Sequence, residues 1–387
     1  GDDTQKAFFL QNNFYYIPGQ AFQVPKGYES LGPNSFPTKD GQFDENPAKA
    51  TGNDVFSATP AVWDWFETVK LNYGVDYQNN RIGHFDPIPS TWLKMKDILL
   101  FWAGKGVDGF RCDAGYKIPT PAWQYIIARV QEEFPDAIFL LEGLGGSWDA
   151  TESLLTDGGM QWAYSELFQN YSGRDVAKYL DYANRQNERV GSYVHYSETH
   201  DNDRLAKKGR VWSLLRNQLC ALASPVGGFG FTCGVEWLAT EKIRVHGNTG
   251  LNWDNANNIV PELAQLNQLI SDHPCFFDGA KLTRLSAPDS PIYALLRESA
   301  DGKDSVLVLV NTDAEKENAV GLSKSAIGNQ QSAIDLLGQP LPKISGAQDK
   351  INFTLPPGAA CCLAPNIKPV GLSGDDYRRA RAQAAFA

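Results

Sequence analysis

The chain has 387 residues, of which 42% are hydrophobic, and carries a formal net charge of −10 at pH 7 with a pI near 5.1. This length can bury a sizeable core and predicts two or three domains. The acidic balance argues against nucleic acid and anionic membranes as partners, and no apolar stretch has membrane-spanning length. The six cysteines show no paired spacing, which indicates reduced thiols and predicts a cytoplasmic protein.

Residues 1–85 are predicted to form a loop-rich domain. Residues 1–60 are rich in Asn, Gly, Pro, Phe and Tyr and contain no amphipathic run of helix length. Such composition is typical of irregular strands and long loops.

Residues 86–274 are predicted to alternate between helices and strands. Ser90 begins a helix that ends before Gly104, while Thr120 and Pro121 supply the N-cap and the first-turn proline of the next helix. Strands are expected at 106–113, 138–142 and 191–196, and near 161–164 and 226–231. Alternation at this spacing is typical of a parallel β/α architecture.

The remaining residues follow a different pattern. Short apolar runs separated by polar turns predict an antiparallel β-sandwich over 275–367. A capped, Ala- and Arg-rich helix is expected in a tail over 368–387. This helix either leads into a further domain or docks on the body of the protein.

Three predicted strands deliver an acidic residue at or just beyond their carboxyl ends: Asp113, Glu142 and Asp201. In a parallel β/α barrel those ends share one face, and unpaired acids make poor core residues because buried charge is costly. Arg111 lies two residues before Asp113, hence on the same face of its strand, where it would favour an ionised carboxylate. The alternative is a structural Arg–Asp pair that closes a strand.

The segments GVDGFRCDA, FLLEG and ETHDND resemble, in order, the second, third and fourth conserved regions of the α-amylase superfamily, glycoside hydrolase family 13. The resemblance covers roughly residues 60–365. It implies that Asp113 is the nucleophile, Glu142 the general acid/base and Asp201 the stabiliser of the transition state. Retaining glycosidases need one ionised and one protonated carboxyl, and Arg111 favours the first role for Asp113.

The resemblance also implies a set of substrate-binding residues, namely Arg111, His200, Asn202, Tyr116 and Lys117. His200 would form hydrogen bonds with sugar hydroxyls. Tyr116 and Lys117 stand where many α-amylases have a Lys-His pair that helps to bind a structural calcium. Their presence argues against that calcium, so no metal ligand is assigned and no cofactor is certain, with calcium left as an open alternative.

The resemblance implies a (β/α)8 TIM-barrel fold with only part of the barrel present. The first conserved region of the family has no match before residue 106, and no space for three β/α units exists there. The chain is therefore expected to carry barrel strands 4–8. Residues 1–85 resemble a remnant of the excursion that the family inserts after strand 3, and the parent chain is expected to supply further domains.

The expected function is a retaining glycoside hydrolase that cleaves α-1,4 bonds of oligo- or polysaccharide α-glucans through a covalent glycosyl intermediate on Asp113. An α-glucan transglycosylase is the alternative within the superfamily, because hydrolases and transglycosylases share all three carboxylates. The alternatives from another class of function are a non-catalytic relative that uses the barrel for binding or as a scaffold, and an incomplete barrel that is inactive by itself.

Overall fold

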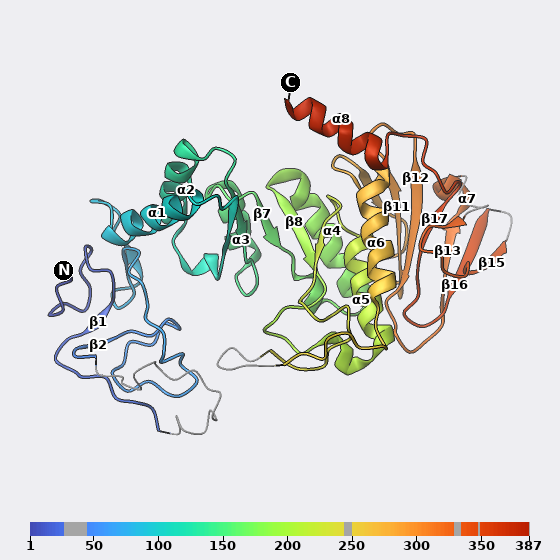
Figure 1. Ribbon diagram of the computed structural model, residues 1–387. Coiled ribbons are helices and arrows are strands. Elements are labelled where there is room, and N and C mark those ends of the chain that lie inside the picture. The colour runs from blue at the N-terminus through green and yellow to red at the C-terminus, as the bar shows by residue number, and fades with distance from the viewer. Residues whose placement is uncertain (27–44, 244–249, 329–333, 347–348, 387) are drawn as a thin grey trace. The chain divides into compact units, whose positions relative to one another are not determined.

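The computed structural model describes residues 1–26, 45–243, 250–328, 334–346 and 349–386 (Figure 1). Within them the chain forms two compact units, one of residues 1–161 and the other of residues 162–243 and 250–386. None of the helices in these ranges is long and apolar enough to cross a membrane. The division of the chain after residues 85, 274 and 367 stays a prediction.

The first unit begins with long loops that are held together by very short pairs of strands. Each strand has two residues and they pair antiparallel, β1 with β2 and β3 with β4: Tyr16–Ile17, Ala48–Lys49, Val75–Asp76 and Ile82–Gly83. Tyr15 is buried among these loops, where its hydroxyl donates to the Val75 carbonyl at 2.7 Å. Its ring packs edge-on against Phe56 and Tyr77, so aromatic side chains substitute for a regular sheet.

Helices and parallel strands follow in the same unit: α1 Ser90–Ala103, β5 Gly109–Cys112, α2 Thr120–Glu133, β6 Ile138–Leu141 and α3 Trp148–Thr156. The predicted start of α1 at Ser90 and its end before Gly104 are confirmed. The predicted N-cap of α2 is wrong by one residue: Thr120 is already helical, and extended Pro119 precedes it as the N-cap. Proline at that position fixes φ near the value that the cap requires.

The second unit continues the alternation of strands and helices: β7 Trp162–Tyr164, α4 Gly173–Arg189, β8 Ser192–Tyr196, α5 Arg210–Leu222, β9 Phe229–Gly230 and α6 Val260–Asp272. β8 pairs in parallel with β7 on one side and with β9 on the other. Parallel pairing between strands separated by helices confirms the predicted β/α architecture in this part of the chain.

The predicted β-sandwich is present. One sheet has the order β10-β11-β12-β17-β14 and the other the order β13-β16-β15. The strands are Lys281–Arg284, Ile292–Glu298, Ser305–Asn311, Asn318–Ser323, Ile334–Asp335, Lys343–Gly346, Lys350–Leu355 and Ala360–Ala364, with a short helix α7 at Lys324–Ile327. Phe353 and Leu309 are fully buried in the core between the sheets.

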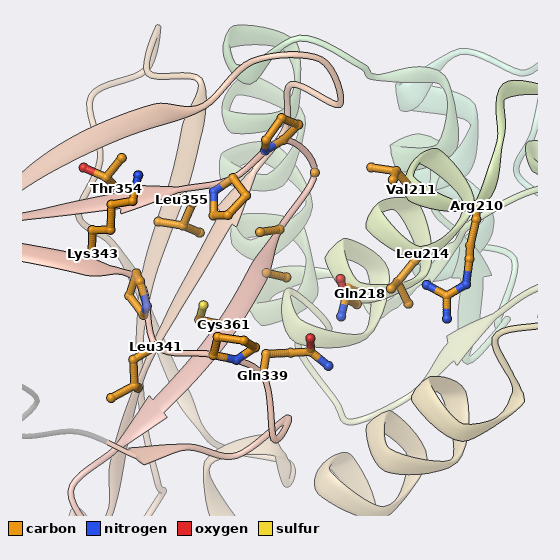
Figure 2. A pocket seen from close by; sticks show the side chains of 17 residues that line it. Arg210, Val211, Leu214, Gln218, Gln339, Leu341, Lys343, Thr354, Leu355 and Cys361 are labelled. Atoms are coloured by element: carbon orange, nitrogen blue, oxygen red, sulfur yellow. The ribbon is translucent and has the colours of Figure 1, made fainter.

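Two arginines attach the sandwich to the β/α part of the second unit. Arg297 on β11 is fully buried and donates to the carbonyls of Leu222 and Cys275, both at 2.9 Å. Arg284 on β10 forms a two-pronged ion pair with Asp181 of α4, at 2.8 and 2.9 Å. A cavity of about 320 Å³ remains where α5 meets the sandwich (Figure 2).

The tail helix α8, Gly374–Phe386, docks on the second unit. Arg378 donates to an oxygen of Asp272 at the end of α6, at 2.6 Å. The ring of Tyr377 stacks on Phe277 with centroids 3.7 Å apart. The predicted contact of this helix with the body of the protein is therefore present, and a further domain beyond it stays a prediction.

Candidate active site

The parallel strands β5 and β6 bring two of the predicted carboxylates together. Cys112 and Leu141 are paired at the ends of the strands, and the Glu142 amide donates to the Cys112 carbonyl at 3.1 Å. Asp113 and Glu142 are the next residue of each strand, so they lie beside each other at the carboxyl edge. A Cβ on Gly109 would lie only 2.7 Å from the Ile138 carbonyl oxygen, which explains a glycine at the start of this pairing.

Arg111 contacts both carboxylates. Its Nη1 donates to Asp113 Oδ1 at 2.5 Å, and its Nη2 lies 3.4 Å from Glu142 Oε2. The Asp113 side chain is 74% exposed, whereas that of Glu142 is 12% exposed. The two acids therefore share one guanidinium but differ in their access to water, which is the condition for different protonation states.

Burial raises the pKa of Glu142 above its usual value, and hydrogen bonding and repulsion from the neighbouring Asp113 carboxylate raise it further. The Ala114 amide, which donates to Glu142 Oε2 at 2.7 Å, and the Arg111 charge oppose this rise. The raised pKa favours a protonated Glu142. The expected roles of acid and nucleophile require such a difference in environment between the two carboxyls.

The turn after Asp113 is held in an unusual backbone conformation. Ala114 has φ 42° and ψ 40°, in the left-handed region that non-glycine residues rarely occupy. A Cβ on Gly115 would lie 2.5 Å from Leu141, and the Gly115 carbonyl accepts a hydrogen bond from Trp123 Nε1 at 3.0 Å. These contacts fix the Ala114 amide where it can donate to Glu142.

Tyr116 packs against the loop that follows β6. A Cβ on Gly145 would lie 2.9 Å from the Tyr116 hydroxyl oxygen, and one on Gly146 would lie 3.0 Å from the ring. Burial raises the pKa of Tyr116, and the charges of Glu142 and Asp113 also raise it. A neutral phenol thus lies close to both carboxylates, and the two glycines make space for it.

Lys117 is engaged by the loop-rich segment. Its Nζ lies 3.3 Å from Asp54 Oδ2, and Asp54 also forms an ion pair with the buried Lys70. Asp54 has φ 65°, a strained conformation that its two lysine partners help to hold. Lys117 therefore connects the turn beyond Asp113 to residues 50–70.

The third predicted acid belongs to the second unit. Asp201 is 55% exposed and its Oδ2 lies 3.5 Å from His200 Nε2, while Lys242 donates to its backbone carbonyl. The Asn202 side chain accepts a hydrogen bond from Thr199. The loop after β8 thus presents His200, Asp201 and Asn202 together on its exposed side.

A buried ion pair supports this loop, and sequence reasoning missed it. Arg204 Nε lies 2.8 Å from Glu198 Oε1, and both side chains are almost fully buried. Glu198 Oε2 accepts from the Leu205 amide at 2.7 Å, and Arg204 Nη2 donates to the Cys233 carbonyl at 2.9 Å. The sequence signal that could have indicated this pair is the position of Glu198 three residues before Asp201 and of Arg204 three residues after it.

The predicted site residues hence form two sets. Arg111, Asp113, Tyr116 and Glu142 lie together in the first unit, with Lys117 held beside them by Asp54. In the second unit the set comprises His200, Asp201 and Asn202. Among the residues that the structure describes, no group of three His, Cys, Asp or Glu side chains could hold a metal ion.

No family model matches the chain. Among curated proteins, it is 26% identical over 279 residues to the α-1,4-glucan:maltose-1-phosphate maltosyltransferase of Cereibacter sphaeroides, covering 65% of this chain and 45% of that protein. The enzyme of the same name from Pseudomonas aeruginosa is 27% identical over 240 residues, covering 58% of this chain and 35% of the relative. The chain thus spans less than half the length of these relatives.

Two solved structures have a similar fold. The α-amylase of Geobacillus thermoleovorans, complexed with acarbose, matches with a TM-score of 0.59 and 15% identity over 77% of this chain and 66% of that one. A Nostoc punctiforme debranching enzyme matches with a TM-score of 0.59 and 17% identity over 80% of this chain and 66% of the neighbour.

These neighbours define the class of fold as a (β/α)8 barrel followed by a C-terminal β domain. The resemblance of this chain to the catalytic region of the α-amylase superfamily, glycoside hydrolase family 13, is confirmed by the sequence relatives and the fold together.

Proposed function

We propose that this protein is a retaining enzyme that cleaves α-1,4-glucosidic bonds of oligo- or polysaccharide α-glucans. The observation that supports this most directly is the geometry at the ends of β5 and β6. An exposed Asp113 and a sheltered Glu142 share the guanidinium of Arg111, and burial raises the pKa of Glu142. The relatives named α-1,4-glucan:maltose-1-phosphate maltosyltransferase agree with this substrate class.

In the first step, an Asp113 oxygen attacks the anomeric carbon of the bound sugar. The bond from that carbon to the glycosidic oxygen breaks, and Glu142 gives its proton to the leaving oxygen. Arg111, whose Nη1 donates to Asp113 Oδ1, orients the carboxylate for this attack. As the family resemblance implies, Asp201 would stabilise the positive charge that develops on the sugar, and His200 and Asn202 would bind sugar hydroxyls.

In the second step, the roles of the acids reverse. The now ionised Glu142 removes a proton from water or from a sugar hydroxyl, whose oxygen attacks the anomeric carbon. The bond to Asp113 breaks and the carboxylate is regenerated. Two inversions at one carbon leave the α-configuration unchanged. Tyr116 and Lys117 would contact sugar units on either side of the broken bond.

Hydrolysis is the first candidate for the second step, and transfer to a sugar is the second. Transfer is favoured by a specific observation: the curated relatives are named maltosyltransferases that use maltose 1-phosphate and α-1,4-glucan. We infer further that β5 to β9 correspond to barrel strands 4–8 and that the protein acts in the cytoplasm.

Product analysis distinguishes these outcomes. Maltoheptaose is incubated with the protein and with its Asp113→Asn variant, and the products are separated by size while proton NMR follows the first anomer formed. Shorter products alone indicate hydrolysis, and longer products, or phosphate release from maltose 1-phosphate with a glucan acceptor, indicate transfer. An initial β-anomer would contradict the retaining mechanism, and unaltered activity in Asp113→Asn would contradict the assigned nucleophile.

A further inference from the structure

A broad depression of about 810 Å³ lies on the second unit, and its lining includes none of the residues predicted for the active site. It is formed by the starts of α4 and α5 and by two loops of the sandwich. Its lining includes Tyr171, Arg174, Lys208, Trp212, Asp289 and Glu315. Four separate stretches of chain therefore converge on one hollow surface.

Two aromatic rings are open to this depression. Tyr171 is 49% exposed and Trp212 is partly exposed, with their ring centroids 5.6 Å apart and their planes inclined at 50°. Single exposed aromatic residues are common, but a pair held inside a hollow is the usual mark of a ligand surface. Flat apolar rings of this kind stack on the C–H faces of sugars.

The buried Arg216 supports the rings of Tyr171 and Trp212. The guanidinium of Arg216 is almost fully buried and lies 5.5 Å from the centroid of Tyr171 and 5.6 Å from that of Trp212. Arg216 in turn donates to the carbonyls of Asn170 and Leu167 at 2.9 and 2.5 Å. Because these contacts fix the rings before a ligand arrives, binding costs little ordering entropy.

Polar side chains surround the rings. Arg174, Asp289 and Glu315 are exposed, and no side-chain hydrogen bond or ion pair within the described residues occupies their charged groups. Lys208 lies over both rings, 5.2 and 4.9 Å from the centroids, so a sugar that stacks on them must displace this flexible side chain. Donors and acceptors of both signs thus line one surface, which suits neutral hydroxyls better than a phosphate or a nucleotide.

We propose that this depression is a second, non-catalytic binding site for α-glucan chains. The choice of ligand rests on the proposed function. Tyr171 and Trp212 stack on two successive sugar units, and Arg174, Asp289 and Glu315 bind their hydroxyls.

The cavity in Figure 2 offers a contrast. Val211 and Leu214 of α5, with Leu341 and Leu355 of the sandwich, line it together with several prolines, and it has no aromatic ring. Nothing in that lining selects a sugar.

The test is affinity electrophoresis in gels with and without soluble amylose, alongside cleavage of maltotriose, which reports the active site. The variants are Trp212→Ala and Tyr171→Ala. Trp102→Ala is the matched control, because Trp102 is 50% exposed and also pairs with a neighbouring ring, Phe101 at 5.3 Å, but is not part of the lining of this depression. Loss of one stacking ring should weaken retardation by amylose roughly three- to tenfold, with maltotriose cleavage unchanged.

The outcomes separate this site from the catalytic proposal. The second site alone is overturned if amylose retards Trp212→Ala as strongly as Trp102→Ala. It is also overturned if amylose does not retard a protein that cleaves maltotriose. Retardation that depends on Trp212 in a protein without cleavage supports the second site and counts against the catalytic proposal. Asp289→Asn and Glu315→Gln leave the rings in place, so a loss of retardation in these variants supports the site even if Trp212→Ala unfolds.

Discussion

The loop that carries Asp201 depends on a buried ion pair, and breaking the pair from one side should be costly. Glu198 and Arg204 lie 2.8 Å apart with side chains 2% and 1% exposed. Besides contacting Glu198, the guanidinium donates to the Cys233 carbonyl at 2.9 Å. Glu198→Ala therefore leaves a buried cation that, among the described residues, keeps one backbone acceptor.

The expected cost follows from this burial. Removing one partner of a buried pair typically destabilises a protein by about 3–5 kcal/mol, because the remaining charge stays desolvated. At roughly 2–4 °C per kcal/mol for a unit of this size, Tm should fall by about 6–20 °C. The double variant Glu198→Ala/Arg204→Met removes the stranded charge and should recover much of the loss, so the two single effects should not add.

Urea unfolding of the four proteins of this cycle, carried out above the Glu198 pKa of about 7 so that the carboxylate is ionised, measures the coupling directly. Asp203→Ala is the matched control, because Asp203 pairs with Lys207 at the same 2.8 Å but is 72% exposed. It should leave the unfolding midpoint unchanged. A loss below 1 kcal/mol in Glu198→Ala, or single effects that simply add in the double variant, would refute the reasoning.

The same pair predicts a dependence of stability on pH. Burial raises the pKa of Glu198 from 4.5 to about 7, against the opposing effects of the Leu205 amide and Arg204. Between these values the folded state holds a proton that the unfolded state has lost. Stability should therefore fall as pH rises from about 4.5 through 7, and Glu198→Gln should remove this part of the profile. An unchanged profile in Glu198→Gln would contradict it.

Two further predictions concern other parts of the molecule. Burial raises the pKa of Glu142, and the first step needs the proton of this carboxyl. As pH rises, kcat/KM should therefore decline only above the usual pKa range of a glutamate side chain. A decline within that range would contradict the role of Glu142. Glu142→Gln should abolish cleavage of unactivated glucans. Phe353→Ala should lower the free energy of unfolding in urea by about 3–5 kcal/mol, since the ring is fully buried between the two sheets. Asn352 is exposed on the same strand, so Asn352→Ala should lower it little. Equal losses in the two variants would argue against a core role for Phe353.

Local patterns predicted much of the fold and the positions of the acids. The apolar runs before Asp113 and Glu142 marked strand ends because strands and their termini are set by nearby residues. Contacts between distant residues were beyond such reasoning. Lys117 contacts Asp54, which is far from it in the sequence. Likewise, the space for Tyr116 is made by Gly145 and Gly146, which lie about 30 residues further along the chain.

The loop after β8 shows the same limit. Glu198 lies in a polar stretch whose composition predicts exposure to solvent. In the folded structure it is buried against Arg204. Likewise, Tyr171 and Trp212 are separated by a whole helix and strand and become neighbours only when α4 and α5 are in place.

The most direct measurement is to trap the covalent intermediate. The Glu142→Gln variant is mixed with maltosyl fluoride, whose fluoride leaves without help from an acid, and the protein is digested and analysed by mass spectrometry. The maltosyl group should be found on the peptide that contains Asp113 and should be absent in Glu142→Gln/Asp113→Asn. A label on another residue, or none while fluoride is released, would contradict the role of Asp113 as nucleophile.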